Sequence, residues 1–106
     1  MRYKLLVKAD PKPGEDAEFN RWYDAVHVPD VLKVEGFVSA ERFIFATEQM
    51  SDTPPSHRYL AIYDLETDDL ATTLAAFRRE HPKMTQSPTL ELDDVTTEIF
   101  ALMVSG

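Results

Sequence analysis

The chain has 106 residues, 43% of them hydrophobic, and a formal charge of -8 at pH 7. This length predicts one domain over residues 1–106, and the acidic balance argues against a nucleic-acid partner, because no basic stripe is present to displace phosphate counterions. The absence of cysteine excludes disulfides and cysteine metal sites, and the short apolar run at the N-terminus favours a cytoplasmic protein that does not enter a membrane.

A strand and an amphipathic helix are predicted for the first 26 residues. Residues 2–10 alternate between an apolar face and a largely polar face, as a β-strand does. The Pro and Gly residues at 11–14 predict a turn, after which acidic side chains suit the positive end of a helix dipole. The helix is expected over residues 15–26, because apolar side chains recur at spacings of three and four, at Phe19, Trp22, Tyr23 and Val26.

A bend is predicted directly after this helix. Val28 and Pro29 cannot continue it undisturbed, since proline lacks an amide N–H and clashes with the preceding turn. Pro29 instead suits the first turn of a short helical segment over residues 30–34, and Gly36 is a plausible stop for it. His27 is therefore expected at a forced bend between helix and sheet.

The middle of the chain predicts two more strands. Residues 37–46 and 57–65 both alternate, with Phe37 and Arg42 on opposite faces of the first. The polar segment 47–56 contains a Pro-Pro pair and is expected to form a long exposed connection between these strands.

A second helix and a fourth strand complete the predicted elements. Thr67 is expected to cap the helix, and Pro82 to end it. Residues 82–93 are predicted to be irregular, and residues 95–104 to form a strand that is apolar on both faces. The apolar stripe of the helix is expected to comprise Leu70, Leu74, Phe77 and His81.

The element order is βαββαβ, without an internal repeat or a linker. This order predicts the α+β ferredoxin-like fold, a four-stranded antiparallel sheet with two helices on one face. The later three strands nevertheless carry apolar residues on both faces, whereas an antiparallel sheet with one face in water should alternate cleanly. A second copy of the chain is the simplest cover for the other face, so we expect a homodimer.

Three segments carry a more specific pattern: Phe19-Asn-Arg-Trp-Tyr23, His27-Val-Pro-Asp30 and Gly36-Phe-Val-Ser-Ala-Glu-Arg42. Together with the βαββαβ order, they resemble the dimeric α/β barrel superfamily, in particular its EthD-like and related small members. The resemblance implies a homodimer whose two sheets form a barrel, with a pocket in each subunit between sheet and helices. Members include cofactor-free monooxygenases, cyclases, lyases, haem-degrading enzymes and proteins of unknown activity, so the resemblance does not select one reaction.

His27 is the leading candidate for acid–base chemistry. It follows Tyr23 by four residues, so it shares the flank of the helix that borders the apolar stripe. An imidazole near its ordinary pKa of about 6.5 accepts or donates a proton at neutral pH. The alternative is a structural histidine that caps the helix or hydrogen-bonds a backbone carbonyl at the bend. The family resemblance favours the catalytic role.

One arginine and several aromatic side chains are candidates for substrate binding. Arg42 lies on an otherwise apolar face of its strand, where a guanidinium needs a partner. That partner is either an anionic group of a ligand or, in a structural role, Asp30 or a neighbour of Glu41. The aromatic candidates, for which core packing is the common alternative, are Trp22, Tyr23, Tyr59 and Tyr63.

No cofactor and no metal are expected. A three-histidine metal site would need His27, His57 and His81 to converge, and no pair of them has the spacing of a ligand motif. His57 and His81 beside their prolines are also positions where exposed histidines are unremarkable. A haem would need an axial histidine in a large apolar pocket, for which His27 or His81 could serve, and neither is singled out. The few glycines form no phosphate-binding loop, which argues against a nucleotide.

The sequence therefore predicts a cofactor-independent enzyme, such as a lyase, isomerase, cyclase or monooxygenase, for a small and partly apolar substrate. His27 would act as the general acid or base, and Arg42 or a tyrosine would orient an oxyanion. One alternative is a noncatalytic dimer that binds a small hydrophobic molecule. Another is a purely structural dimer in which His27 only ends a helix, and this alternative requires that no cavity lies beside His27.

Overall fold

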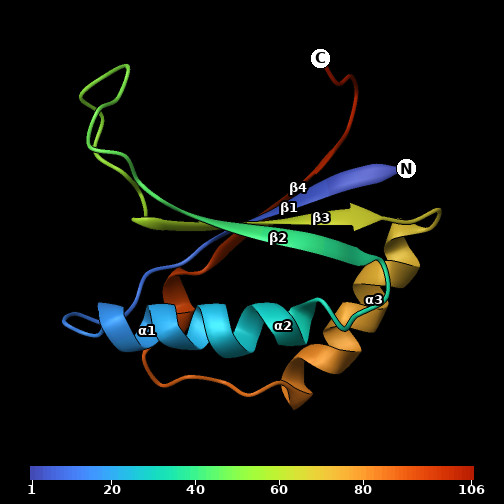
Figure 1. The fold of residues 1–106 in the computed structure, drawn as a ribbon, viewed down its shortest axis with the longest axis horizontal. Helices are drawn as coiled ribbons and strands as arrows, with labels where there is room; N and C mark the ends of the chain where they lie inside the picture. The colour runs from blue at the N-terminus through green and yellow to red at the C-terminus, as the bar shows by residue number, and fades with distance from the viewer.

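The computed structural model describes residues 1–106 and contains one four-stranded antiparallel sheet, whose helices lie on one face (Figure 1). The strands are β1 (Arg2–Lys8), β2 (Phe37–Ile44), β3 (Tyr59–Glu66) and β4 (Thr96–Ala101), in the spatial order β2-β3-β1-β4. The helical elements are α1 (Asp16–Trp22), a π-helical turn (Tyr23–His27), α2 (Val28–Val31), α3 (Leu70–Glu80) and the 3-10 turns His81–Lys83 and Leu92–Asp94. This arrangement confirms the predicted α+β ferredoxin-like fold.

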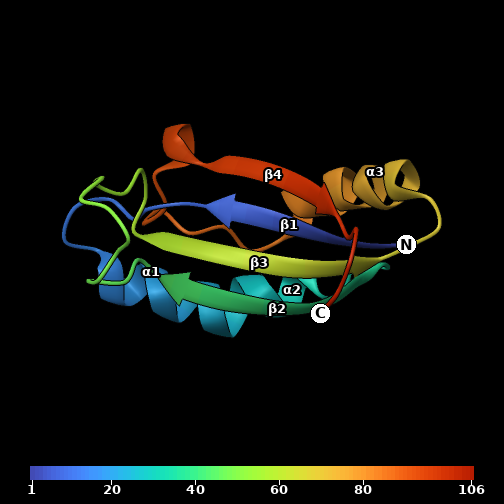
Figure 2. The ribbon, with the colours of Figure 1, turned by 90° about the horizontal axis from the view of Figure 1, so that it is seen from above.

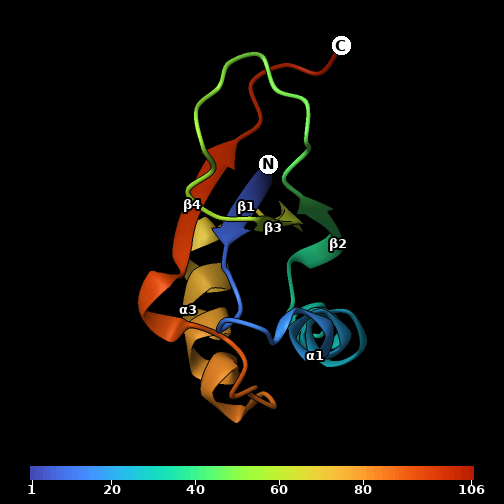
Figure 3. The ribbon, with the colours of Figure 1, turned by 90° about the vertical axis from the view of Figure 1, so that its left-hand side faces the viewer.

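The helices divide the covered face of the sheet between them. Figures 2 and 3 show α1 and α2 along the β2 side of the sheet and α3 along the β4 side. Phe19 of α1 is fully buried, and it packs in the same cluster as Tyr63 and Leu65 of β3. The core therefore lies between the sheet and the helices. No helix is long and apolar enough to cross a lipid bilayer.

The helix that begins at Asp16 does not bend away at Pro29, as predicted, but continues to Val31 through one wide turn. His27 and Val28 both keep right-handed helical backbone angles, so the prediction of a forced bend at His27 and a separate segment over 30–34 is wrong. Pro29 has no N–H to donate to the preceding turn and its ring would clash with a carbonyl there. The π-helical turn relieves that conflict, with the Val28 N–H bonded to the carbonyl of Tyr23.

A bulge at the start of β2 changes which residues face the helices. Phe37 pairs with Leu65, but after an irregularity the register resumes with Ala40 opposite Tyr63 and Arg42 beyond it. Phe37 and Arg42 thus lie on the same face of the sheet, whereas strict alternation predicted opposite faces. One extra residue in a strand reverses every later side chain, which explains the error.

The connections at the ends of the helices depend on particular residues. Gly36 has a φ of 96°, and a Cβ there would lie 2.8 Å from the Thr73 side chain, so only glycine fits between α2 and β2. The N-cap of α3 is Asp69, whose carboxylate accepts the Thr72 N–H at 3.1 Å. The prediction that Thr67 caps this helix is wrong, because Thr67 lies before the N-cap residue and its hydroxyl accepts the Asp69 N–H.

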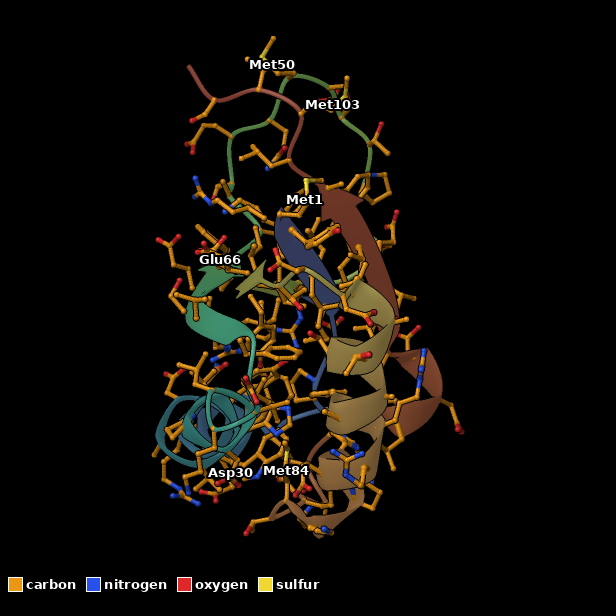
Figure 4. All side chains as sticks on the ribbon, turned by 90° about the vertical axis from the view of Figure 1, so that its right-hand side faces the viewer. Met1, Asp30, Met50, Glu66, Met84 and Met103 are labelled. Carbon is orange, nitrogen blue, oxygen red and sulfur yellow. The ribbon has the colours of Figure 1, made fainter.

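The face of the sheet away from the helices carries a cluster of apolar side chains on three strands. Leu6 of β1 is opposite Ile62 of β3, and Leu60 is opposite Phe43 of β2, which is 44% exposed. The connection 45–58 and the tail after Ala101 project on this side (Figure 1). Figure 4 places Met50 and Met103, which are fully exposed, on the opposite side of the sheet from the helices. We call this surface the outer face.

The strand ends differ from prediction by a few residues. β4 ends at Ala101 rather than at 104, because its partner β1 begins at Arg2 and offers no further pairing beyond the Leu102 N–H bond to the Arg2 carbonyl. The predicted long connection 47–56 is exposed throughout.

Candidate functional site

A cavity of about 370 Å³ lies between the sheet and the helices, and most of its lining side chains are hydrophobic. Leu5 of β1, Tyr63 of β3 and Trp22 of α1 form its deep part and are almost fully buried. On the side of the edge strand β4, the cavity is lined by Leu92, in the turn before this strand, and by Ile99 of the strand itself. Leu92 is 68% exposed and Ile99 is 36% exposed. The cavity is thus deep on the side of α1 and open beside β4.

The wide turn in the first helix places His27 in this cavity. Residues five apart in a regular α-helix point about 140° away from each other, but in a π-helical turn they lie one above the other. Trp22 and His27 have this spacing, and their rings stack with centroids 4.7 Å apart. The indole is fixed in turn by its N–H, which donates to the Thr85 carbonyl at 2.9 Å. The orientation of His27 therefore depends on the π-helical turn and on an anchored tryptophan.

His27 is held unprotonated at neutral pH. Its Nδ1 is buried without a hydrogen-bond partner, which leaves Nε2 as the ring nitrogen that can meet a molecule in the cavity. The pKa of His27 is lowered from 6.5 to about 4, chiefly by burial; His81 and Arg42 act in the same direction, and Asp30 opposes them. The expectation of an imidazole with its ordinary pKa is therefore corrected.

A second histidine, His81, lines the same cavity from the end of α3. Its ring lies 6.0 Å from that of His27 and 5.3 Å from that of Phe77, measured between centroids. His81 was predicted to lie on the apolar stripe of the helix, with no role at the site beyond that of a haem ligand. Its position on the stripe, four residues after Phe77, was the signal that it faces inward.

Two tyrosines, Tyr23 and Tyr63, line the cavity together with His27. Tyr23 packs edge-on against His27 at 5.1 Å, and Tyr63 reaches the cavity from β3. Burial raises the pKa of both phenols above the ordinary value. Tyr23 raises the pKa of Tyr63 further, and the buried Tyr63 Oη makes no hydrogen bond of ordinary geometry. Both phenols are protonated at neutral pH.

Arg42 does not line the cavity. Its guanidinium lies over the ring of Tyr23 at 4.2 Å, bonded to Asp24 at 2.8 Å and to Asn20 at 2.9 Å. Asp30, one of the partners considered for it, instead lies 3.5 Å from Lys33. Arg42 therefore pairs with side chains of the first helix and packs on the ring of Tyr23. This geometry offers no support for contact between Arg42 and a substrate in the cavity.

Tyr59 and His57 also lie outside the cavity lining. The Tyr59 hydroxyl donates to Asp16 at 2.8 Å, and the same carboxylate binds Arg58, so this tyrosine fixes β3 to α1. The expectation that His57 is an unremarkable exposed histidine is wrong, since its side chain is only 5% exposed. His57 Nε2 donates to the Asp94 carbonyl at 2.6 Å, which ties the connection 45–58 to the turn before β4.

Few groups near the cavity could hold a metal ion. His27 and His81 are the two imidazoles in its lining, and no cluster of three or more His, Cys, Asp or Glu side chains forms there or elsewhere in the chain.

A smaller and more polar pocket of about 250 Å³ lies at the ends of the helices, where Asp30 and Met84 are close together (Figure 4).

Comparison with known proteins identifies the fold. No protein-family model and no curated protein matches the sequence. Among solved structures, the chain is similar to an EthD-like protein from Ralstonia eutropha, with a TM-score of 0.65, 14% identity, and coverage of 99% of this chain and 95% of that one. A protein from Shewanella loihica proposed to be a monooxygenase has a TM-score of 0.62 and 8% identity over 98% and 96% of the two chains.

A further structure that matches is described as a dimeric ferredoxin-like protein of unknown function, from a Jannaschia species. Its TM-score is 0.51, with 16% identity over 96% of this chain and all of that one. Identities this low show a common fold and leave the activity open. The resemblance inferred from the sequence, to EthD-like and related ferredoxin-like proteins, is confirmed at this level.

Proposed function

We propose that the protein is a cofactor-independent enzyme that acts on a small, partly apolar substrate in the cavity between sheet and helices. The observation that carries this proposal is His27, an imidazole on the wall of an apolar cavity that is kept unprotonated at neutral pH. A buried polar atom without a partner, such as its Nδ1, reduces stability by about 1–3 kcal/mol, and such groups are concentrated at functional sites.

The chemistry that suits this geometry is proton transfer. His27 Nε2 takes a proton from a carbon atom of a bound substrate, and the electron pair of the broken C–H bond forms an enolate anion beside the new imidazolium. The two charges then stabilise each other in a cavity where water is scarce and electrostatic interactions are strong. Trp22, Tyr23 and Tyr63 provide walls of the cavity in which this ion pair would form.

One observation favours the alternative of a noncatalytic binding protein. A pKa of about 4 makes His27 a weak base, and a general base acts best when its pKa is near the working pH. In this alternative the cavity takes up a small hydrophobic molecule, and His27 only accepts a hydrogen bond. The purely structural alternative has no such support, because it requires that no cavity lies beside His27.

We also infer that the protein is a homodimer formed through the outer face. The cluster of Leu6, Phe43, Leu60 and Ile62 leaves apolar surface on the side of the sheet that no helix covers. A symmetric dimer buries such a surface against its own copy. The dimeric ferredoxin-like protein from Jannaschia supports this inference by its fold and its description.

Turnover and binding can be separated with a metabolite extract. The wild-type protein and His27→Asn are incubated with the extract, and both the free and the protein-bound compounds are identified by mass spectrometry. We expect wild type to consume a compound that the variant only retains, because asparagine keeps a hydrogen-bonding group but cannot exchange a proton near neutrality. His57→Asn, which removes a histidine outside the cavity, serves as the control and should keep turnover. Retention without consumption by wild type would reject the enzyme and favour the binding protein.

A further inference from the structure

No carboxylate side chain lines the cavity. The chain holds 19 Asp and Glu against 11 Lys and Arg, yet none of the acidic residues lines the cavity. Besides the two phenols, its ionisable groups are Arg78, His27 and His81, which are cationic or neutral. The cavity thus carries no negative charge, although the protein as a whole is strongly acidic. Its permanent charge is the positive charge of Arg78, which favours an anionic ligand.

Arg78 is a cation without a partner. It lies near the end of α3, is exposed, and makes no ion pair and no hydrogen bond, whereas its neighbour Arg79 lies 3.7 Å from Glu80. The other arginines on the helical side of the protein, at positions 21, 42 and 58, all pair with a carboxylate. Arg78 is therefore the one arginine that is both free and part of the cavity lining.

The polarity of the cavity changes along its depth. Its inner part is formed by buried apolar and aromatic side chains such as Leu5, Val31 and Trp22, while Arg78 lies on its exposed rim with Leu92. A volume of about 370 Å³ is within the usual range for a small organic ligand, roughly 300–1,000 Å³. A guanidinium on the rim is well suited to bind a carboxylate in the bidentate manner that arginine favours.

We propose that the ligand of this cavity is an amphipathic organic anion, with an apolar body in the cavity and a carboxylate beside Arg78. This proposal rests on the proposed function, because it names the class of molecule that the same cavity takes up. The charge at the rim orients the ligand, so that its uncharged end reaches His27 and Tyr63.

Two ligands with the same body test the role of charge. 1-Naphthaleneacetate carries a carboxylate, and 1-naphthaleneacetamide replaces it with a neutral amide. Their dissociation constants are measured by calorimetry at low salt for wild type, Arg78→Gln and Arg79→Gln. The Arg79 variant is the matched control, since it removes the same charge from the adjacent residue, which does not line the cavity.

We expect wild type to bind the acid more tightly than the amide. Arg78→Gln should weaken binding of the acid roughly fivefold, which corresponds to about 1 kcal/mol, the upper range for an exposed ion pair. The same variant should leave the amide unaffected, and Arg79→Gln should change neither ligand. Salt should weaken binding of the acid to wild type but not to Arg78→Gln.

Three outcomes would overturn the proposal, and they separate it from the proposed function. If wild type binds acid and amide equally, or if the Arg79 variant loses as much affinity as the Arg78 variant, the ligand is not selected by charge at Arg78. The cavity would then remain a binding site, and the proposed function would stand. If neither compound binds wild type at millimolar concentration, both the anionic ligand and the cavity as a site for small molecules are rejected.

Discussion

Replacing His27 with asparagine should change how the stability of the protein depends on pH. In the unfolded chain the imidazole has its ordinary pKa of 6.5, whereas in the folded protein burial lowers the pKa to about 4. Between these values the unfolded state binds the proton more readily, so wild type should lose stability as the pH falls from about 6.5 towards 4. Asparagine does not titrate in this range, so the variant should lack the part of this loss of stability that His27 causes.

The size of the effect follows from the two pKa values. At about pH 5 the contribution of His27 should lower the free energy of unfolding of wild type by about 2 kcal/mol relative to pH 7.5, and below pH 4 by about 3 kcal/mol. Urea denaturation of both proteins at about pH 7.5 and pH 5, at one protein concentration, measures it. Other titrating groups are common to both proteins and cancel in the comparison.

Two results would refute this reasoning. Equal loss of stability in wild type and variant would mean that His27 is not buried in an apolar cavity. If wild type instead gained stability at low pH relative to the variant, the influence of Asp30 on His27 would outweigh that of burial, and the histidine would be charged at neutral pH. Either result would remove from the proposal the buried base that is unprotonated at neutral pH.

Three further predictions concern assembly and stability. Sedimentation should give wild type a mass of twice the 12.1 kDa of one chain. Ile62→Lys places a charge on the outer face and should give a monomer, whereas Ile44→Lys places it on the opposite face and should leave the dimer. An unchanged dimer in the Ile62 variant would place the contact elsewhere. Gly36→Ala should lower the free energy of unfolding by about 2–3 kcal/mol in urea denaturation, because alanine is strained at positive φ and would contact Thr73; a loss under 0.5 kcal/mol would contradict the described backbone. Arg42→Met should lower the free energy of unfolding by about 2 kcal/mol through its lost charged hydrogen bonds, with unchanged affinity for a cavity ligand by calorimetry; reduced affinity at full stability would restore a direct binding role.

Residue spacing was sufficient to predict most of the fold. Phe19, Trp22 and Tyr23 recur at helical intervals and do pack as one buried cluster against the sheet. The alternation in residues 2–10 likewise identified the face of β1 that carries Leu5. Such patterns depend on local periodicity and burial, which a single sequence records directly.

The errors arose where one residue more or less changes the geometry. Pro29 was interpreted as a break, but a helix can absorb a proline by widening one turn, and the sequence does not record that choice. The bulge after Phe37 reversed the faces of β2 in the same way, which brought Arg42 inside. In both places packing against the rest of the protein decided the outcome.

The candidate site was only partly predictable, because it is assembled from distant parts of the chain. His27 was found by its place beside the apolar stripe, whereas His81 and Arg78 reach the cavity from α3, more than fifty residues later. Their convergence depends on how α3 packs beside α1 beneath the sheet, and no local pattern shows this. The pKa of His27 was missed for the same reason, since burial by distant residues sets it.

Transfer of a proton from a bound ligand to His27 is the central claim, and deuterium exchange measures it without knowledge of the overall reaction. Compounds that the protein retains from a metabolite extract are incubated in D₂O with wild type or His27→Asn, and their masses are followed over time. We expect wild type to introduce deuterium at a carbon position of at least one retained compound, and the variant to introduce none. Retained compounds that never exchange with wild type, or that exchange equally fast with His27→Asn, would contradict the claim.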